Sequence, residues 1–232
     1  MIVSGKNTAN EILKNKQKIN KVLISDTFKD EKLILELEKR KIQITVRSKN
    51  ELDRIDKSNH QGIILDIPDY EYFDLKDVIK KEKGFLLILD HIEDPHNFGA
   101  IIRTCEAAGV DGIIIPKDRS VEVTSTVMRT SAGALSNFKI IEVTNLKTTI
   151  DKLKKANYWI FGTEMNFEKS YKDFDYSNMN ICLIIGSEGF GMSKIIKESC
   201  DYLISIPMKG KINSLNASVA AGILIYKISE NR

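Results

Sequence analysis

Apolar runs that alternate with helical patterns fill the chain after Gly84 and restrict its fold more than any other feature. These runs are rich in Ile, Leu and Val and have the length of strands. They are FLLILD (85–90), DGIIIP (111–116), FKIIEV (138–143), YWIFGTE (158–164), ICLIIG (181–186) and YLISIP (202–207). Strands that are so uniformly apolar are buried on both faces. We therefore expect an α/β fold with a mostly parallel sheet covered by helices on both sides.

The first quarter of the chain predicts a smaller α/β unit, in which short strands again alternate with helical patterns. The polar stretch that opens with Pro68 and closes with Gly84 has the composition of a linker. We expect a first domain over residues 1–67, a linker over 68–83 and a second domain over 84–232.

Charge is distributed unevenly along the chain, although the net charge is only +3. Residues 1–62 contain 14 Lys and Arg against 9 Asp and Glu, whereas the remainder contains 21 against 23. A basic excess in the first domain favours contact with a polyanion such as RNA. A solvated lysine-rich surface gives the same counts, so charge alone leaves both interpretations open.

Cysteine use and hydropathy argue against several classes of protein. Cys105, Cys182 and Cys200 are odd in number and form no C-x-x-C pair, so neither disulfides nor a zinc site are expected. No apolar stretch approaches the roughly 18 residues that span a bilayer, and the first residues lack a signal-peptide pattern. We expect a cytoplasmic protein without a membrane partner.

Three polar loops follow predicted strands, where ligands bind to parallel sheets. In the first loop, over residues 89–109, Asp94 and Pro95 fit a helix entry. Along that helix Asn97, Ile101 and Cys105 fall roughly on one face, and Arg103 lies about a turn and a half beyond Asn97. Arg103 is therefore a candidate site residue, although a surface position on a helix flank fits it equally well.

The second loop, over residues 183–199, is rich in glycine and carries Glu188. Glycine permits a positive φ and a close backbone approach to a ligand. The phosphate-loop pattern fails because Met192 stands where Lys is required, and the dinucleotide fingerprint lacks its third Gly. A carboxylate also repels phosphates, so this loop favours a neutral or cationic ligand.

The third loop, over residues 204–226, leads into a helix of small residues. Ser214 and Asn216 are suited to cap this helix, and a capping role alone would explain both residues without a functional site. The run from Ala217 to Gly222 has little side-chain bulk, so another backbone or a second subunit is expected to pack closely against it.

Taken in order, the three loops resemble the signature motifs of the SpoU/TrmH family of SPOUT methyltransferases. The motif N-x-G-x-x-x-R matches at Asn97, Gly99 and Arg103, G-x-E-x-x-G matches at Gly186, Glu188 and Gly191, and I-P-M…S-L-N-[AV]-S-V-A matches at 206–208 and 214–220. The first domain is similar to the ribosomal-protein-like RNA-binding domain of bacterial members that modify 23S rRNA. That similarity rests on Gly5, Asn7, Glu11, Leu13 and the HQG at 60–62.

The resemblance implies S-adenosylmethionine-dependent 2′-O-ribose methylation of rRNA, with a guanosine in 23S rRNA as the expected target. It implies a deep trefoil knot, a homodimer, and no metal. It also implies a cofactor site at Thr163, Gly186, Ile206, Met208 and Leu215. The implied catalytic group is Arg103, supported by Asn97, Glu188, Ser214 and Asn216. The expected partner is 23S rRNA or a ribosomal assembly intermediate.

Other interpretations stay open at this stage. A tRNA ribose is an alternative substrate for the same fold, and a non-catalytic RNA-binding assembly factor is an alternative of a different class. A nucleotide-dependent oxidoreductase is weakened by the broken glycine fingerprints. His91 and His96 invite a metal or acid–base interpretation, but the loop contains no third ligand at a suitable spacing.

Overall fold

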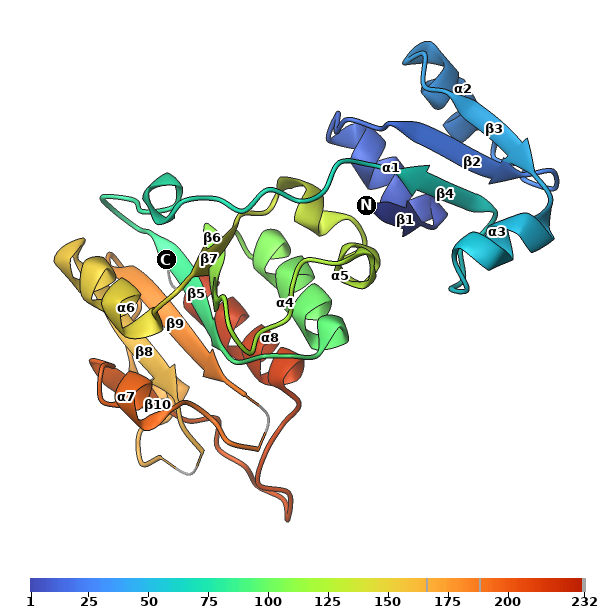
Figure 1. The fold of residues 1–232 in the computed structure, drawn as a ribbon. Helices are drawn as coiled ribbons and strands as arrows, with labels where there is room; N and C mark the ends of the chain where they lie inside the picture. The colour runs from blue at the N-terminus through green and yellow to red at the C-terminus, as the bar shows by residue number, and fades with distance from the viewer. Residues whose placement is uncertain (166, 188, 231–232) are drawn as a thin grey trace. The chain divides into compact units, whose positions relative to one another are not determined.

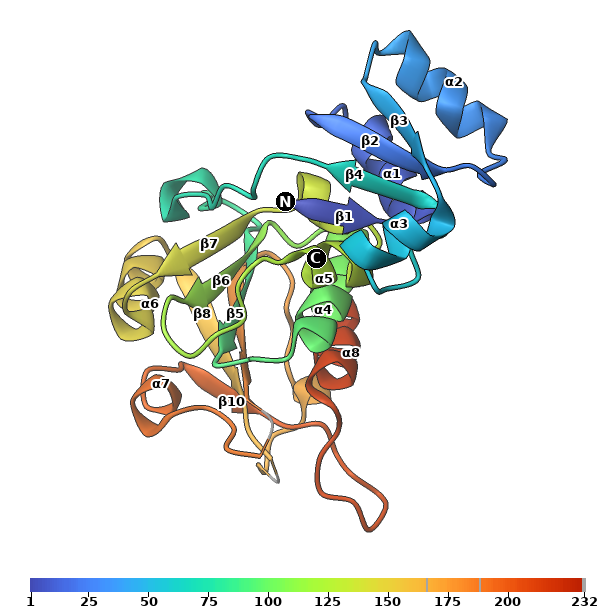
Figure 2. The ribbon, with the colours of Figure 1, turned by 45° about the vertical axis from the view of Figure 1, so that its right-hand side comes forward.

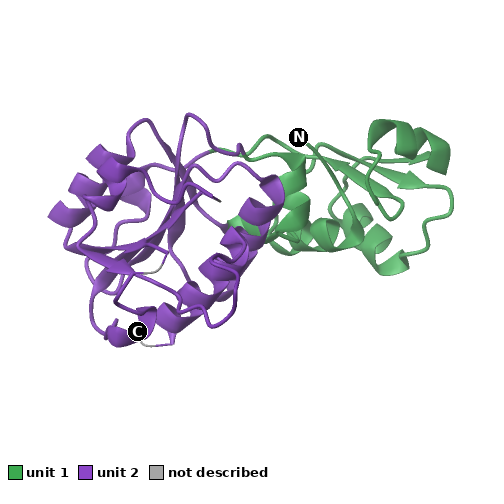
Figure 3. Cartoon of the chain, turned by 90° about the horizontal axis from the view of Figure 1, so that it is seen from below, with its two compact units in different colours: residues 1–71, 123–137 green, residues 72–122, 138–232 purple. Residues whose placement is uncertain are grey.

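The structure, a computed structural model of the 232-residue chain, describes residues 1–165, 167–187 and 189–230. The chain divides into two compact units (Figure 3). Unit 1 contains Met1–Glu71 and Val123–Asn137, and unit 2 contains Tyr72–Glu122 and Phe138–Arg232. The sequence placed residues 123–137 within the second domain, whereas in the structure they pack with the first unit.

Unit 1 is built on a four-stranded mixed sheet with the order β1-β4-β2-β3. β2 and β3 are parallel, whereas β4 runs antiparallel to both β1 and β2. The strands are β1 (Ile2–Ser4), β2 (Lys21–Ser25), β3 (Ile44–Arg47) and β4 (Ile63–Asp66). The helices are α1 (Lys6–Lys14), α2 (Glu31–Lys39), α3 (Lys49–Ile55), α5 (Ser125–Thr130) and the 3-10 turn η2 (Ala134–Asn137).

The late segment joins unit 1 because it carries its own apolar face. Val127, Met128 and Leu135 are each no more than 2% exposed. α5 contacts β1, and η2 contacts α1. Ser136 accepts a hydrogen bond through its backbone oxygen from Gln17 Nε2 at 3.2 Å. Such long-range contacts do not show in a local pattern of strands and helices.

Unit 2 contains a six-stranded, all-parallel sheet with the order β10-β8-β9-β5-β6-β7, which confirms the expected fold class. The strands are β5 (Phe85–Asp90), β6 (Gly112–Pro116), β7 (Ile140–Val143), β8 (Tyr158–Thr163), β9 (Asn180–Gly186) and β10 (Tyr202–Ile204). The helices are α4 (Pro95–Ala107), α6 (Leu146–Lys155), α7 (Lys194–Lys197) and α8 (Ala217–Ser229), with 3-10 turns η1 (Leu75–Asp77) and η3 (Tyr171–Asp173).

Helices cover both faces of this sheet. Figures 1 and 2 show α4 packed beside α8 on one face, with α6 and α7 on the other. All six residues of β5 are buried, as are the first six of β9, which is why these strands read as continuous apolar runs. The small residues of α8 allow α4 to pack closely against it. A Cβ added at Gly222 would lie 4.0 Å from the side chain of Thr104 in α4.

The strand order reverses between β5 and β9. The chain runs from β5 outward to β6 and β7, then crosses over to β8, β9 and β10 on the other side. β5 and β9 are paired in parallel up to Asp90 and Gly186. The loops that follow these two strands therefore leave the sheet side by side, at the position where parallel sheets bind their ligands.

The cysteines are unpaired, and burial makes them unreactive. Cys105 and Cys182 are fully buried, and burial raises the pKa of each thiol. Burial also raises the pKa of Cys200 to about 12, so this thiol stays protonated at neutral pH. Within the described parts of the chain, no helix is long and apolar enough to cross a membrane.

Candidate active site

The Asp90 side chain forms hydrogen bonds with both of the loops that follow β5 and β9. Its carboxylate is 1% exposed and accepts a hydrogen bond from His91 Nδ1. The second carboxylate oxygen accepts from the backbone N–H of Ser193 at 3.0 Å. A buried carboxylate needs such donors to offset its lost hydration, and here they fix the relative position of the two loops. His91 therefore has a carboxylate partner of its own.

Gly186 lets the second loop fold back on itself. A Cβ at this position would lie 2.3 Å from the carbonyl carbon of Gly191 and 2.4 Å from the nitrogen of Met192. Ser187 and Gly191 pair through reciprocal backbone hydrogen bonds of 3.1 and 3.0 Å, which close the turn. Only glycine fits this approach. Glu188, predicted to act in catalysis, lies outside the described residues.

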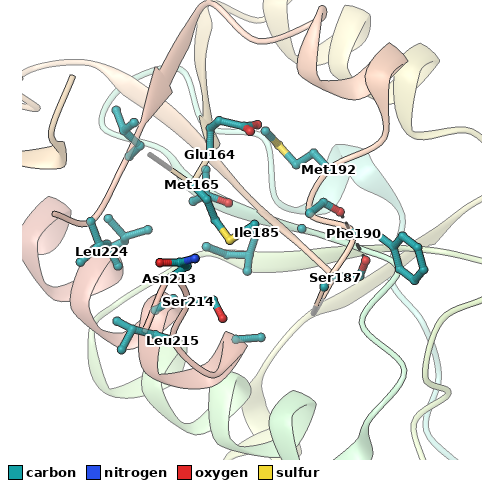
Figure 4. A pocket seen from close by; sticks show the side chains of 18 of the residues that line it. Glu164, Met165, Ile185, Ser187, Phe190, Met192, Asn213, Ser214, Leu215 and Leu224 are labelled. Atoms are coloured by element: carbon teal, nitrogen blue, oxygen red, sulfur yellow. Dashed lines mark hydrogen bonds between the residues drawn. The ribbon is translucent and has the colours of Figure 1, made fainter. Parts of the chain in front are cut away.

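A cavity of about 640 Å³ opens between this turn, the ends of β8 and β10, and the start of α8. Its size suits a small organic ligand, for which sites of about 300–1,000 Å³ are usual. The five residues predicted to bind the cofactor all line it, together with two of those predicted to act in catalysis. They are Thr163, Gly186, Ile206, Met208, Leu215, Ser214 and Asn216. Figure 4 labels Leu215 and Ser214 among them.

The walls of this cavity are mixed, with an apolar part and an ion pair at one side. Ile185, Ile204 and Leu224 contribute hydrocarbon surface that suits the faces of an aromatic ring. The half-buried Glu164 carboxylate lies 2.9 Å from Lys197 Nζ, so these two charges compensate each other. Such a cavity suits a ligand with a flat ring and little net charge.

Asn97 and Asn216 connect the first and third predicted loops. Asn97 is 7% exposed, and its side-chain oxygen accepts a hydrogen bond from Asn216 Nδ2 at 2.9 Å. Asn216 also caps α8, because its side-chain oxygen accepts from the N–H groups of Ser218 and Val219 at 3.0 and 3.4 Å. Ser214, which the sequence offered as an alternative cap, is instead exposed at the cavity wall.

Arg103 lies on the exposed flank of α4, whereas Asn97, Ile101 and Cys105 on the same helix are buried. This is the division of faces that the spacing predicts. Arg103 is not among the residues that line the cavity. The structure thus brings Asn97, Ser214 and Asn216 to one region and leaves Arg103 outside the cavity wall.

A second cavity, of about 570 Å³, shares a wall with the first and contains residues that sequence reasoning did not single out. Arg119, in the loop after β6, and Phe190, in the glycine-rich turn, line it. An exposed Phe inside a glycine-rich loop was the one local signal that pointed to this place. Across the residues that the structure describes, no group of three or more His, Cys, Asp or Glu is placed to hold a metal ion.

Comparison with known families gives a match for each part of the chain. Residues 84–226 match the family described as the SpoU rRNA Methylase family. Residues 2–73 match the family described as RNA 2′-O ribose methyltransferase substrate binding.

Curated relatives align over almost the full chain. A relative from Staphylococcus saprophyticus, assigned to the TrmH family of tRNA/rRNA methyltransferases, is 43% identical and covers 100% of this chain and 96% of its own length. The relative YacO from Bacillus subtilis, assigned to the same family, is 42% identical and covers 99% of this chain and 95% of its own length.

Solved structures share the fold. The SpoU methyltransferase AviRb from Streptomyces viridochromogenes, in complex with AdoMet, has a TM-score of 0.85 at 22% identity, over 99% of this chain and 89% of its own. An AdoMet-bound rRNA methyltransferase from Sinorhizobium meliloti has a TM-score of 0.84 at 24% identity, over 99% of this chain and 86% of its own.

Proposed function

Because the chain belongs to the SpoU rRNA Methylase family, we propose that it transfers a methyl group from S-adenosylmethionine to a ribose 2′-hydroxyl of 23S rRNA, at a guanosine. One observation carries this proposal. Residues from all three signature motifs meet beyond the carboxyl ends of β5 and β9, around one cavity and the Asn97–Asn216 hydrogen bond.

The cavity fits S-adenosylmethionine in size and chemistry. The apolar part of its wall suits the adenine ring, and Gly186 leaves main-chain groups accessible where any larger residue would meet Gly191. When bound, S-adenosylmethionine would supply a sulfonium methyl group, and its transfer to the ribose oxygen would leave S-adenosylhomocysteine and release the hydroxyl proton to water. Thr163, Ile206, Met208 and Leu215 would hold the ligand.

The residues of the chain act by holding the ribose and stabilising charge. A guanidinium is a permanent cation and a poor base, so Arg103 serves as an electrostatic anchor for a substrate phosphate and for the developing alkoxide. The Asn97–Asn216 hydrogen bond fixes the start of α4 against the start of α8. Ser214 and Glu188 complete the proposed catalytic group.

Dimerisation is part of the same proposal. Arg103 does not line the cavity of its own chain, and α8 exposes Val219 and Tyr226, which are 50% and 47% accessible. Exposed apolar side chains on one helix suit a homodimer interface. The deep trefoil knot that the family implies belongs to this proposal as well.

The match of residues 2–73 to a substrate-binding family and the basic excess of residues 1–62 support RNA as the substrate. The same residues favour 23S rRNA, or a ribosomal assembly intermediate in the cytoplasm, over a small RNA. A tRNA ribose is the second candidate, because the relatives are assigned to a tRNA/rRNA methyltransferase family.

Methyl transfer from labelled S-adenosylmethionine to protein-free 23S rRNA, to bulk tRNA and to immature large-subunit particles tests the proposal, with the product nucleoside identified by mass. The proposal expects 2′-O-methylguanosine in 23S rRNA or in the particles. A product found only in tRNA would instead support methylation of a tRNA ribose, the second candidate. Binding of S-adenosylmethionine without any product would favour the non-catalytic assembly factor.

A further inference from the structure

The second cavity lies directly beside the proposed methyl donor. Ser187, Phe190, Gly191 and Met192 line both cavities, so the turn after β9 forms a common wall. Every residue that lines the second cavity belongs to unit 2. A ligand in this cavity would therefore lie next to a ligand in the first cavity, at the turn that lines both.

Phe190 offers an unoccupied aromatic surface at this wall. Its side chain is 95% exposed, and none of the ring contacts found among the described residues includes it. Figure 4 shows its ring apart from the other labelled side chains. Exposure of an apolar Phe ring to water is unfavourable, and a partner that covers the ring gains that free energy. A nucleobase is a suitable partner, because stacking on an aromatic side chain stabilises binding by about 1–3 kcal/mol per base.

Arg119 supplies a positive charge to the same cavity. Its side chain is exposed, and it makes no hydrogen bond or ion pair with another described residue. Its φ of 52° is in the left-handed region that non-glycine residues seldom adopt. The loop is held nonetheless, because the N–H of Val121 donates to the oxygen of Ile92 at 3.0 Å. A guanidinium so held is suited to bidentate contact with a phosphate.

The carboxylates around the cavity are compatible with a nucleotide. Asp90 is occupied by His91 and Ser193, and Asp94 accepts from the N–H of His96 at 2.9 Å as the cap of α4. Glu93 is exposed and has no partner among the described residues. A carboxylate accepts hydrogen bonds from the N–H groups at the edge of a base, and guanine presents two such groups side by side, whereas each of the other bases presents one.

We infer that this second cavity holds the acceptor nucleotide, with its base on Phe190, an adjacent phosphate on Arg119, and its ribose at the wall shared with the methyl donor. This inference rests on the proposed function and adds its substrate site. Arg119 and Phe190 are positioning residues for the ribose hydroxyl, and Glu93 favours guanine at the base edge.

Removal of the Arg119 side chain tests the phosphate contact. Arg119→Ala is expected to lower kcat/KM for RNA by roughly 10- to 100-fold, because a charge-assisted contact is lost. Affinity for S-adenosylmethionine, measured by calorimetry, should stay within about twofold of the wild type because the residue does not line the first cavity. Arg119→Lys should recover part of the loss, since the charge returns without the bidentate geometry.

Lys117→Ala is the matched control. Lys117 is an exposed cation two residues away in the same loop and lines neither cavity. Its removal should change kcat/KM by less than about threefold, as for an isolated solvent-exposed charge. Equal losses in Arg119→Ala and Lys117→Ala would reduce the effect to general attraction between a basic loop and RNA, and would overturn the inference.

Phe190 variants test the base contact. Phe190→Ala should lower kcat/KM for RNA by roughly 5- to 100-fold, and Phe190→Trp should retain activity because it keeps a stacking surface. Phe190→Leu separates stacking from hydrophobic bulk and should resemble the alanine variant. Because Phe190 also lines the first cavity, the S-adenosylmethionine affinity of each variant is measured alongside. A leucine variant as active as the wild type would contradict stacking.

A nucleotide titration provides a readout that does not depend on turnover. Guanosine 5′-monophosphate and guanosine are titrated into the full chain loaded with S-adenosylhomocysteine, and backbone amide shifts are followed by NMR. The monophosphate should bind more tightly than the nucleoside, with shifts around Arg119 and Phe190, and Arg119→Ala should remove the difference. Absence of shifts in this cavity, or an unchanged difference in the variant, would overturn the inference.

Failure of the proposed function and failure of this inference give different results. A wild-type chain that binds the monophosphate in this cavity but methylates no RNA would contradict the proposed function alone. A wild-type chain that methylates RNA while Arg119→Ala remains fully active would contradict the inference alone.

Discussion

Unit 1 and unit 2 use their β-strands in different ways. β5 of unit 2 is buried along its whole length, whereas β3 of unit 1 is an edge strand whose Val46 and Arg47 are exposed. In unit 2 the strands form the core and the polar groups lie in the loops at their carboxyl ends. In unit 1 the edge strand β3 and the outer helix surfaces meet solvent. The difference leaves unit 2 with polar loops at the carboxyl ends of its strands, where the proposed cofactor site lies, and unit 1 with an exposed strand at the edge of its sheet.

The largest expected effect is that of Arg103→Ala in unit 2. Loss of a charged group that acts on the transition state should lower the methylation rate by roughly 10²–10³-fold. Cofactor affinity should stay within a few-fold because Arg103 does not line the cavity. Single-turnover methylation and calorimetry measure the two quantities. Glu106→Ala, an exposed change on the same helix, is the control and should leave both unchanged. Near-normal turnover in Arg103→Ala would remove it from the catalytic group.

Gly186→Ala should act on the cofactor rather than on RNA. The added Cβ would displace Gly191, which it would approach at 2.3 Å, and would distort the turn that bounds the cavity. We expect S-adenosylmethionine affinity to fall by roughly 100-fold, the scale of a forced backbone shift in a packed region. Gly210→Ala is the control, because an added Cβ there meets nothing within 4 Å. Circular dichroism verifies that the sheet is retained. Equal affinities in the two variants would show that the turn does not shape the site.

Leu135→Ala tests whether residues 123–137 support unit 1. Leu135 is fully buried in that unit, so its truncation should lower the free energy of unfolding of unit 1 by roughly 2–3 kcal/mol. Cofactor affinity should not change, since unit 2 has a core of its own. Hydrogen exchange resolves the stabilities of the two units. Lower hydrogen-exchange protection in unit 2, with unchanged protection in unit 1, would contradict the assignment of residues 123–137 to unit 1.

The smallest expected effect is a pH dependence of unit 1. Desolvation raises the pKa of Asp56, but hydrogen bonds from Ser4 and Ser58 outweigh it, so the net pKa lies below the ordinary value of 3.8. A lowered folded pKa contributes stability above pH 3.8 that is lost as the pH falls through the folded value.

Asp56→Asn should therefore destabilise unit 1 slightly at pH 7, by about 0.5 kcal/mol once solvent screening is allowed for. The difference from the wild type should shrink below pH 4 and vanish in stronger acid. Urea unfolding across pH 2.5–7 measures it, and Asp26→Asn, an exposed change in the same unit, is the control. A difference that stays constant with pH would show that the Asp56 hydrogen bonds do not depend on ionisation.

Local patterns were sufficient for the main elements of unit 2. Continuous Ile, Leu and Val runs predicted its parallel strands, whereas the order of these strands in the sheet came from the structure. Capping chemistry identified Asp94 and Asn216, whose side chains cap α4 and α8 in the structure. These features depend on residues close together in the chain, where periodicity and hydrogen-bonding preferences act.

Long-range packing limited what the sequence could predict. Residues 123–137 join unit 1 through contacts such as that of Gly133, where a Cβ would lie 2.5 Å from Glu11 Cβ, more than a hundred positions away. The second cavity brings Arg119 to the same wall as Phe190, although they follow different strands. Arg119 has no local pattern that indicates a partner, and Phe190 has only its place in a glycine-rich loop, so the folded chain is needed to reveal the pair.

The most direct test of the account is a nucleoside inventory of RNA from cells that lack this protein. RNA from such cells, from wild-type cells, and from cells complemented with either the wild-type chain or Arg103→Ala is digested, and methylated nucleosides are quantified by mass. The account predicts that one 2′-O-methylguanosine of 23S rRNA disappears and that only the wild-type chain restores it. An unchanged set of methylated nucleosides, or restoration by Arg103→Ala, would contradict it.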